Sequence, residues 1–420
     1  MENITKVVNS GLCLGCGICQ DVCSKNCIRI LKGRELNKPI VLFDNCSECK
    51  LCLKICPGQG IDISFRANQL FNEKCIEEDK YLGRYLSCYS GYSNDYDVRY
   101  HSASGGMVSQ FLIYLLESKV ITGAVVVGFM SKDPMKPHVY IAKTKNEILA
   151  GRSSKYCVVS YETIVRQVQE EKGKYVIVGL PCHIHAFRKY ESIFKVFKEY
   201  VIGYFSLFCS ATKNYLSQEY LLYRYNINKN EIKSFSYRDD GCMGYMKFIN
   251  HDDKVIKKIP CLSYYIPMRG FFNAARCSLC IDHYGELADV CFGDLHVGEY
   301  AKDTIGVNSI IVRNHHWNNL LKQASDKEYV TINKISFNLI NSSQGYIFKH
   351  KKGPGIVAAF MFRKILLKRI PVYDIPFISN LQFKYLIREI RNYVSRFIGR
   401  YPSLWFIIKM LDNPEPFRDE

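Results

Sequence analysis

The chain has 420 residues, of which 48% are hydrophobic and 23% are charged. This composition is typical of a globular protein with two or three domains and disfavours a disordered chain. No apolar run reaches the roughly 20 residues that span a bilayer, and the first residues lack the features of a secretory signal. We therefore expect a cytoplasmic protein.

The net charge of +17 bears on the partners. Such an excess suits nucleic acid, an anionic membrane surface or an acidic protein. No recognised basic or RNA-binding motif accompanies the charge, so we expect no nucleic-acid partner. The charge alone does not choose between a membrane and a protein.

Regular cysteine spacing marks the first 65 residues, in a chain with 19 cysteines in total. A reducing cytosol disfavours reading them as disulfides. The pattern Cys-x2-Cys-x2-Cys-x3-Cys occurs twice, 33 residues apart, and Pro57 follows its second copy. This duplicated pattern is that of a bacterial ferredoxin, so we predict a double 4Fe-4S ferredoxin-like domain at 1–65.

The spacing also predicts which cysteines share a cluster. Three closely spaced cysteines of each run bind one cluster, and the fourth binds the other. One cluster is expected on Cys13, Cys16, Cys19 and Cys56, and the second on Cys46, Cys49, Cys52 and Cys23. Zinc is the alternative, but it prefers cysteine pairs separated by a longer spacer. Cys27 fits neither cluster and is interpreted as a small buried residue.

Helices and strands alternate after the cysteine-rich segment. Glycines at 105–106 open an apolar helix, and an apolar run at 123–130 reads as a buried strand. Continued alternation predicts an α/β domain at 85–225. Shorter strand-like pieces and turns follow at 226–345, and a basic, aromatic tail with two helical segments occupies 346–420.

The order of motifs in the body resembles the beta subunits of coenzyme F420 hydrogenases and dehydrogenases, with their relatives among ferredoxin-dependent chlorophyll-pigment reductases. The resemblance runs from about Gly11 to about Gly298. After the cysteine runs, its motifs are Ser104-Gly105-Gly106, Ser154-Lys155-Tyr156, Gly179-x-Pro181-Cys182, Cys209, Tyr237-Arg238-Asp239, Cys277-x2-Cys280, and Ala288-Asp289 leading to Gly293-Asp294. This resemblance implies an iron-sulfur flavoprotein whose segments 85–225 and 226–345 correspond to the family's N-terminal and C-terminal domains.

The expected fold class is therefore a combination of α+β and α/β parts. A bacterial-type ferredoxin domain comes first, an α/β flavin-binding body follows, and a basic helical tail ends the chain. The helix that begins after Ser104, Gly105 and Gly106 offers free amides that could hold the pyrophosphate of FAD. Ser154 and Lys155 could add a hydroxyl and a charge. Without the resemblance, these residues would read as an ordinary helix start and a solvated loop.

Several positions depart from the family's motifs. The run Leu180-Pro181-Cys182-His183 replaces Thr-Pro-Cys-Gln, Cys209-Ser210-Ala211 replaces a Cys-His-Gly run, and Leu295-His296 replaces an aromatic pair. These positions are expected near the substrate. Their changes therefore put coenzyme F420, a deazaflavin, in doubt as the substrate of this protein.

Four further cysteines could hold a third 4Fe-4S cluster. The Cys277-x2-Cys280 pair needs two outside ligands, and Cys182 and Cys209 each follow a predicted strand, where α/β folds gather site residues. The alternative is that all four are small buried residues. His183 follows Cys182 at a helix start and is the candidate proton donor, with a satisfied core or surface histidine as the alternative.

The preferred function is an oxidoreductase of ferredoxin-dependent or coenzyme F420 type. It would take electrons from ferredoxin or another redox protein and pass them through 4Fe-4S clusters and FAD to an unidentified small-molecule organic substrate. The alternative is a non-catalytic electron-transfer subunit of a larger redox complex, which would have no substrate pocket of its own.

The tail raises the question of peripheral membrane contact. Residues 356–410 combine aliphatic and aromatic side chains with Arg and Lys at helical intervals, and residues 363–409 carry a net charge of +8. Such a helix can lie in the headgroup region at the inner face of an anionic membrane, with Tyr401, Trp405 and Phe406 at the interface. The alternative is a helix pair packed on the body with its basic face in water.

Overall fold

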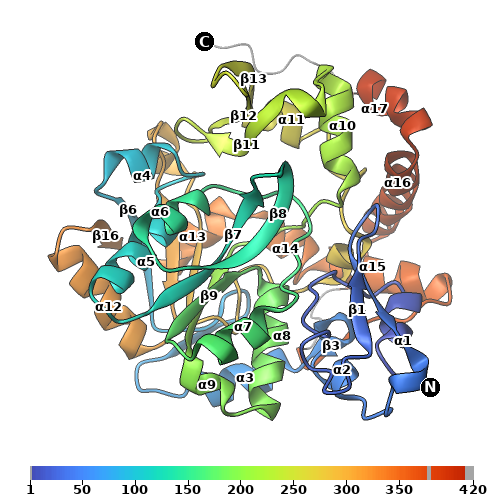
Figure 1. Cartoon of the computed structure of the whole chain (residues 1–420), viewed down its shortest axis with the longest axis horizontal. Helices are drawn as coiled ribbons and strands as arrows, with labels where there is room; N and C mark the ends of the chain where they lie inside the picture. The colour runs from blue at the N-terminus through green and yellow to red at the C-terminus, as the bar shows by residue number, and fades with distance from the viewer. Residues whose placement is uncertain (1, 376–379, 412–420) are drawn as a thin grey trace.

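Among the residues described by this computed structural model, 2–375 and 380–411, eight strands form a mixed sheet at the centre of the molecule (Figure 1). In spatial order they are β16 (Val330–Lys334), β6 (Ser87–Ser93), β15 (Asn308–Val312), β14 (Val290–Asp294), β10 (Val201–Leu207), β9 (Tyr175–Gly179), β7 (Gly123–Met130) and β8 (Asp133–Ala142). The middle strands β14, β10, β9 and β7 are parallel, and the outer pairs are antiparallel. The carboxyl ends of the parallel strands therefore meet at one edge, where α/β proteins usually bind ligands.

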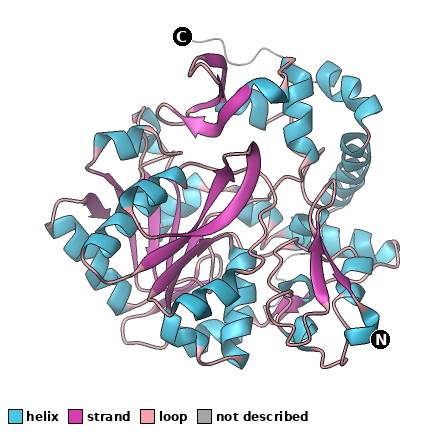
Figure 2. Cartoon of the chain, in the orientation of Figure 1, coloured by secondary structure: helices cyan, strands magenta, loops and turns pink. Residues whose placement is uncertain are grey.

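Helices cover both faces of this sheet (Figure 2). In β9, Val176 and Val178 enter one core while Tyr175 and Ile177 enter the other, because successive side chains of a strand point to opposite faces. The first core is closed by α5 (Met107–Glu117), α6 (Lys145–Ala150) and α12 (His315–Asp326). The second is closed by α7 (Ile164–Glu171), α8 (Pro181–Ile193) and α9 (Phe197–Tyr200). The helices and strands expected between residues 85 and 225 are thus present.

The sheet crosses the boundary expected between residues 225 and 226. Strands β14, β15 and β16 come from the later segment, yet β14 pairs with β10, and β15 and β16 both pair with β6. Pairing between strands this distant in sequence depends on tertiary packing, so local periodicity does not reveal it. One sheet is therefore built from both predicted segments.

The middle of the later segment forms a separate layer near the carboxyl edge of the main sheet (Figure 1). Its antiparallel sheet consists of β11 (Ile232–Asp239), β12 (Tyr245–Asn250) and β13 (Val255–Pro260). The helices α10 (Leu216–Tyr225) and α11 (Cys261–Tyr265) pack on it around buried Tyr237, Tyr264 and Phe272. This layer forms the third hydrophobic core and stands opposite the strand ends.

The cysteine-rich head packs directly on the body. Its elements are α1 (Thr5–Asn9), β1 (Ile28–Leu31), β2 (Lys38–Val41), α2 (Leu51–Lys54), β3 (Gly60–Ile61) and α3 (Ile63–Leu70), and the hairpin of β4 (Glu77–Asp79) and β5 (Gly83–Tyr85) leads onward. Gly15 and Gly17 have positive φ, and a Cβ on them would lie 2.9 Å from Val158 and 2.3 Å from Ser160. Only glycine therefore allows this loop to approach the body so closely.

The tail connects the head with the third core. After α13 (Phe337–Ser343), which ends the preceding segment, its elements are α14 (Tyr346–His350), α15 (Pro354–Ile365), β17 (Val372–Tyr373), α16 (Phe383–Arg400) and α17 (Trp405–Leu411). Strand β17 pairs with β3 of the head. Trp405 is buried against Tyr220 and Phe272, which corrects the expectation that this ring lies at a membrane interface. In the described part of the chain, no helix combines the length and apolarity that crossing a bilayer requires.

A buried ion pair joins helix α8 to the middle of the sheet. The guanidinium of Arg188 donates to Asp289 at 3.0 Å, and the same carboxylate accepts the Tyr204 amide at 2.8 Å and the Asn314 side-chain amide at 3.0 Å. Asp289 belongs to one of the motifs noted above, and its contacts assign it a structural role. It fixes α8, and with it the start of α8 beside the site, relative to β10 and β14.

We expect Asp289→Ala to lower the free energy of unfolding by about 3–5 kcal/mol, because buried Arg188 would keep only Glu191 as a carboxylate partner and the Tyr204 and Asn314 amides would lose their acceptor. Urea unfolding of the purified holoprotein measures the change. The matched control is Asp252→Ala in an exposed turn, where the change should stay within about 0.5 kcal/mol. A loss below about 1 kcal/mol for Asp289→Ala would contradict the structural role.

Candidate functional site

Cys13, Cys16, Cys19 and Cys56 of the head come together as one buried group. Burial raises the pKa of Cys16, and the neighbouring Cys56 and Cys13 thiols raise it further. Burial likewise raises the pKa of Cys19, with contributions from Cys16, Cys56 and Cys13. Backbone amides face two of the sulfurs, since Gly15 donates to Cys13 and Gly58 to Cys56, each at 3.4 Å. The group matches the set expected for the first cluster.

The other head cysteines line a small cavity nearer the surface. Its wall contains Cys23, Cys46, Cys49 and Cys52, the set expected for the second cluster. Cys49 is exposed, so this group reaches the protein surface. Cys27 is buried, as expected, but it lines the same cavity with its sulfur 3.2 Å from that of Cys23. Sequence spacing gave no sign of this contact.

Cys182, Cys209, Cys277 and Cys280 form a third group, although they come from distant parts of the chain. Burial raises the pKa of Cys182, and Cys209, Cys280 and Cys277 raise it further. Cys182 follows β9, Cys209 follows β10, and the other two lie on a turn before β14. The carboxyl edge of the sheet thus gathers all four. Cys16 of the head also contributes to the raised pKa of Cys182, so the third group adjoins the first.

The spacing of the sulfurs in these groups is wider than zinc requires. Among the described residues, no three cysteine sulfurs all lie within 4.8 Å of one another. A zinc ion with four bonds of about 2.3 Å would hold its sulfurs about 3.8 Å apart. The residues therefore fit a larger group such as a 4Fe-4S cluster better than a single zinc ion.

Buried cations surround the third group. Lys351 adjoins Cys280, Cys209 and Cys277 and donates to the Asp282 carbonyl at 2.8 Å. Arg276 bridges to the head, because it donates to the Gly58 carbonyl at 3.1 Å. Buried thiolates need nearby positive charge, and these two side chains supply it. Neither residue was identified from sequence, where isolated basic residues carry no signal.

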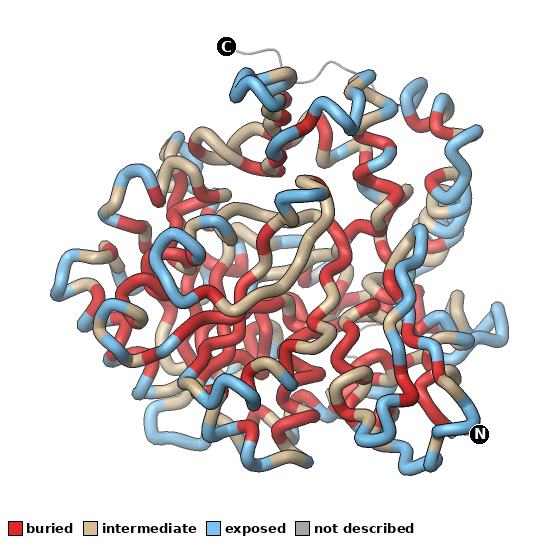
Figure 3. Tube along the Cα trace, in the orientation of Figure 1, coloured by how far each residue is buried: buried red, intermediate tan, exposed pale blue. Residues whose placement is uncertain are grey.

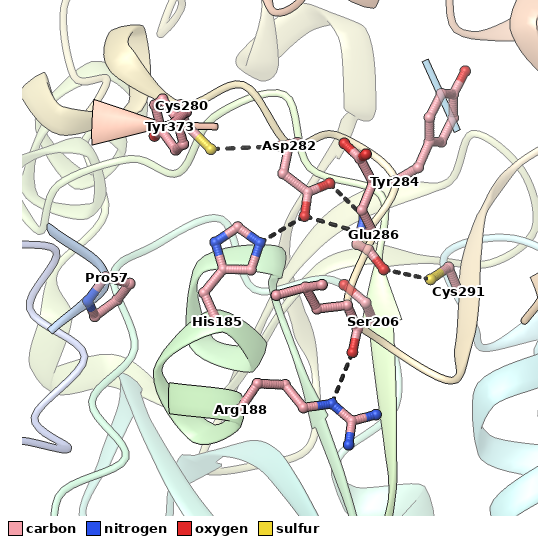
Figure 4. A network of polar contacts seen from close by, with 12 residues as sticks. Pro57, His185, Arg188, Ser206, Cys280, Asp282, Tyr284, Glu286, Cys291 and Tyr373 are labelled. Atoms are coloured by element: carbon pink, nitrogen blue, oxygen red, sulfur yellow. Dashed lines mark hydrogen bonds and ion pairs between the residues drawn. The ribbon is translucent and has the colours of Figure 1, made fainter. Parts of the chain in front are cut away.

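A network of hydrogen bonds holds the segment after Cys280 (Figure 4). The Asp282 carboxylate lies 2.8 Å from His185 and accepts the amides of Gly285 at 2.8 Å and Glu286 at 3.0 Å. Burial opposes ionisation of Asp282, but His185, with Lys352 and Lys351 nearby, holds its pKa at about 2. The Cys277–Cys280 turn is therefore attached firmly to α8, the helix that carries Cys182.

A cavity of about 410 Å³ opens at the carboxyl edge of the parallel strands, next to the third cysteine group. Such a volume is typical of a site for a small molecule or cofactor. Cys209 belongs to the cysteine group and also lines this cavity. The start of α5, the segment 151–156 and the layer of β11 to β13 supply much of the remaining wall. The third group therefore lies within contact of a bound ligand.

The predicted phosphate-binding residues divide into two kinds. Ser104 and Gly106 line the cavity together with Val108 and Ser109, whose amides lie in the first turn of α5. Such amides have no acceptor within their own helix, so they fit an anionic group. Gly105 is different, because a Cβ there would lie 2.7 Å from the Gly91 carbonyl and 2.9 Å from the Asn308 amide. This glycine is required by strand packing and is absent from the residues that line the cavity.

Ser154 and Lys155 also line the cavity. The Lys155 ammonium donates to the carbonyls of Gly151, Arg152 and Ser153, at 2.5, 2.6 and 3.1 Å. Burial lowers the pKa of Lys155 to about 7. It therefore closes its own loop and places a readily titrated positive charge in the cavity wall, which suits an anionic ligand such as the pyrophosphate of FAD.

His183 lines the cavity but remains neutral. Burial lowers its pKa to about 3, and its Nδ1 accepts the Leu180 amide at 3.2 Å. A neutral ring held in this tautomer can donate a hydrogen bond from Nε2. This geometry favours a role in orienting a ligand over one as a proton donor.

Three arginines line the cavity, Arg152, Arg238 and Arg269, and none is among the site residues predicted from sequence. Arg238 donates to Asp294 at 2.6 Å and to the Met243 carbonyl at 2.8 Å, and its own carbonyl accepts the Ser153 hydroxyl. Arg269 also lines the cavity, and its guanidinium lies over the Tyr265 ring. Arg238 stood within a noted motif, whereas Arg269 follows no pattern that local sequence could reveal.

Comparison with known proteins identifies three consecutive matching regions. Residues 12–62 match the 4Fe-4S dicluster domain. Residues 88–166 match the N-terminal region, and residues 172–337 match the C-terminal region, of the family described as "Coenzyme F420 hydrogenase/dehydrogenase, beta subunit". Residues 338–420, which include α15 to α17, lie beyond these matches.

Two similar proteins are named for coenzyme F420. The coenzyme F420-dependent sulfite reductase of Methanocaldococcus jannaschii is 25% identical over 79% of this chain and 49% of its own length. The coenzyme F420 hydrogenase subunit beta of Methanosarcina barkeri is 32% identical over 27% of this chain and 39% of its own length. The chain thus spans about half or less of these two relatives.

A solved structure supports the fold assignment. A chain of the F420-reducing [NiFe] hydrogenase complex from Methanosarcina barkeri matches with a TM-score of 0.54 and 21% identity, over 70% of this chain and 98% of that chain. This likeness shows a shared fold. With the dicluster domain followed by both regions of the beta-subunit description, the chain belongs to the coenzyme F420 hydrogenase/dehydrogenase beta-subunit family.

Proposed function

We propose that this iron-sulfur redox protein is an oxidoreductase that passes electrons from a ferredoxin-like donor, through 4Fe-4S clusters and FAD, to an organic substrate in the 410 Å³ cavity. One observation carries the proposal: the cysteine groups form an uninterrupted series from the surface to the cavity. Bound clusters would supply one-electron transfer, and FAD would couple it to two-electron chemistry.

Contacts between thiols support the order of this series. The outermost group contains exposed Cys49 and adjoins the first group through Cys52, whose thiol contributes to the raised pKa of buried Cys19. The first group adjoins the third through Cys16 and Cys182. Cys209 then belongs to both the third group and the cavity wall.

The surface around the outermost group suits an acidic electron donor. Exposed basic side chains of the head are Lys25, Arg29, Lys32, Arg34, Lys38, Lys50 and Lys54. Complementary charge raises the rate of encounter between redox proteins. We therefore assign the donor, a ferredoxin or similar protein, to the surface around Cys49.

Residues of the cavity have separate roles in this proposal. The first-turn amides of α5 and the Lys155 charge would hold the FAD pyrophosphate, and the Nε2–H of His183 would orient the reacting end of a ligand. Coenzyme F420 itself is one candidate substrate, because two relatives are named for it. The changed motifs at 180–183, 209–211 and 295–296 favour a different unsaturated organic substrate.

A non-catalytic role in a larger assembly is the second candidate, because the similar solved chain belongs to a hydrogenase complex. Purified protein with reduced viologen as donor, and coenzyme F420 or another acceptor added, distinguishes the two. Turnover without a partner supports the oxidoreductase. If FAD is absent after anaerobic purification and reconstitution, the electron-transfer role becomes the better assignment.

The first prediction concerns iron content. Anaerobically purified protein should contain about twelve irons per chain if all three groups hold 4Fe-4S clusters. Replacing Cys277 and Cys280 together with serine should lower this to about eight and leave the EPR signals of the head intact. Chemical iron analysis and EPR spectroscopy measure both effects. Cys75→Ser, at an exposed cysteine outside the groups, is the matched control.

Each outcome of the iron analysis has a distinct meaning. About eight irons in the unchanged protein would eliminate the third cluster and keep the head clusters. One zinc and no iron would overturn the whole electron path. Cys23→Ala and Cys56→Ala test the exchange of fourth ligands, because each should damage the cluster held by the opposite cysteine run.

A second prediction concerns the protonation of Lys155. Because the pKa of Lys155 is about 7, this side chain is mostly neutral at pH 8 when no flavin is bound. An adjacent phosphate would raise that pKa, so binding of FAD to flavin-free protein should take up as much as about one proton. Titration calorimetry in two buffers of different ionisation enthalpy measures this uptake.

Lys155→Met should abolish most of the proton uptake and weaken FAD binding by about tenfold, since the positive charge near the phosphates is lost and the loop loses its bonds to the carbonyls of Gly151, Arg152 and Ser153. Lys322→Met, at an exposed lysine on α12, should change neither quantity. Equal proton uptake in the Lys155→Met variant would remove this lysine from the proposed FAD site.

A further inference from the structure

Helix α16 exposes an apolar face, while its inner face carries buried Glu389 together with Ile398, which packs on the third core. The apolar face is a stripe of side chains that are 43% to 72% exposed: Phe383, Ile387, Ile390, Val394, Phe397 and Tyr401. Their spacing of four and three residues places them along one side of the helix. The helix runs along the outside of the molecule, and most of its trace is exposed or intermediate (Figures 1 and 3). This is the reverse of the usual amphipathic surface helix.

Specific contacts fix this orientation. Glu389 is buried on the inner face and accepts from Arg388 at 2.8 Å and from Asn392 at 3.3 Å. Gly399 lies so close to the Phe271 carbonyl that a Cβ there would lie 2.2 Å from it. At the end of the helix, Arg400 pairs with Glu35 of the head at 2.7 Å. Rotating the stripe inward would break all of these contacts.

Neighbouring elements continue the apolar surface. The Phe362 ring lies 5.8 Å from the Tyr393 ring, which places the end of α15 beside the middle of α16. Past Phe362, α15 and its C-terminus expose Ile365, Leu366 and Leu367, the last at 96%. Beyond α16, α17 exposes Phe406 and Met410. A surface of this kind on one side of a protein marks a site of interaction.

The charges that flank the stripe decide between partners. Lys384, Arg391 and Arg400 lie next to it in sequence and are exposed, whereas the acidic neighbour within the helix, Glu389, is buried on the inner face. Two copies of α16 packed along their stripes would bring these cations together, without the opposite charges that pair such helices. Lys364, Lys368 and Arg369 add exposed positive charge at the end of α15. Long basic side chains beside an apolar stripe instead suit anionic headgroups.

We propose that α16, with the adjoining end of α15, lies in the headgroup region of an anionic membrane and attaches this protein to it peripherally. The stripe enters the boundary with the acyl chains, and the flanking Lys and Arg side chains contact the lipid phosphates. This inference does not depend on the proposed redox function, since α16 lies outside the residues that match the family. Two arrangements of the tail were expected from sequence: contact with a membrane, or packing on the body with the basic face in water. The exposed apolar stripe favours contact with a membrane.

One consequence follows for the cavity. Arg269 lines it, and the next residues, Gly270 and Phe271, pack beneath α16. The cavity wall and the proposed membrane helix are therefore joined by one short segment.

Vesicle flotation of the full-length holoprotein tests the proposal. The protein should float with vesicles of phosphatidylcholine mixed with phosphatidylglycerol at low salt, and less with phosphatidylcholine alone or at high salt, because salt screens the lysines and arginines. Replacing Ile387 and Val394 together with glutamate should reduce the floated fraction by about tenfold, since two carboxylates would face anionic lipid. Replacing the comparably exposed Val196 and Val255 with glutamate is the matched control and should have little effect.

Three results would overturn the proposal: unchanged protein that stays with the soluble fraction, a stripe variant that floats as well as the unchanged protein, or a dimer without lipid that the stripe substitutions convert to a monomer. The last result would assign the stripe to a second copy. Iron and flavin contents measured on the same samples show that the stripe variant is folded. They also separate failure of this inference from failure of the redox assignment.

Discussion

The contact between the first cysteine loop of the head and the body determines whether the molecule can function as one electron path. Gly15 and Gly17 bring that loop against Val158 and Ser160, and the Tyr161 amide donates to the Cys16 carbonyl at 2.8 Å. On the other side, Arg276 holds the turn after Cys56. Electron transfer between buried groups requires that they stay close, so a head on a flexible linker would not serve. The apolar core that runs from the head into the body makes the attachment rigid.

Much of the site could be predicted because its determinants are either local or topological. Ligand spacing within each head run is a local property, so the two head groups could be expected as neighbours in space. Cys182 and Cys209 follow strands, and parallel strands bring their ends to one edge whatever their order in the sheet. Their meeting with Cys277 and Cys280 does not follow from strand topology, because these two precede β14 and are placed by the contacts of Asp282 with His185, Gly285 and Glu286. The order of the strands in the sheet could not be predicted from sequence, because β14 to β16 join β6 and β10 through pairings with no local signature.

Several properties depend on neighbours that are distant in sequence. A side chain at Gly105 is excluded by the Gly91 carbonyl and the Asn308 amide. Of the two environments considered for Trp405, the structure shows the packed one, because Tyr220 and Phe272 contact the ring. Periodicity showed that α16 has an apolar side without showing which side faces the protein. Each of these properties is set by neighbours far away along the chain, and a sequence pattern carries no record of them.

The structure also resolves the net charge of +17 into separate surfaces. Exposed basic residues of the head form one group, which includes Arg29, Lys38 and Lys54, and another group flanks the stripe of α16. Arg400 and Glu35 join the two regions directly, so the tail and the head are held in one arrangement. Positive charge at the head acts over the Debye length on an approaching donor, whereas charge beside an apolar stripe acts at contact with headgroups. The same excess of lysine and arginine thus suits two partners at once, and neither requires nucleic acid.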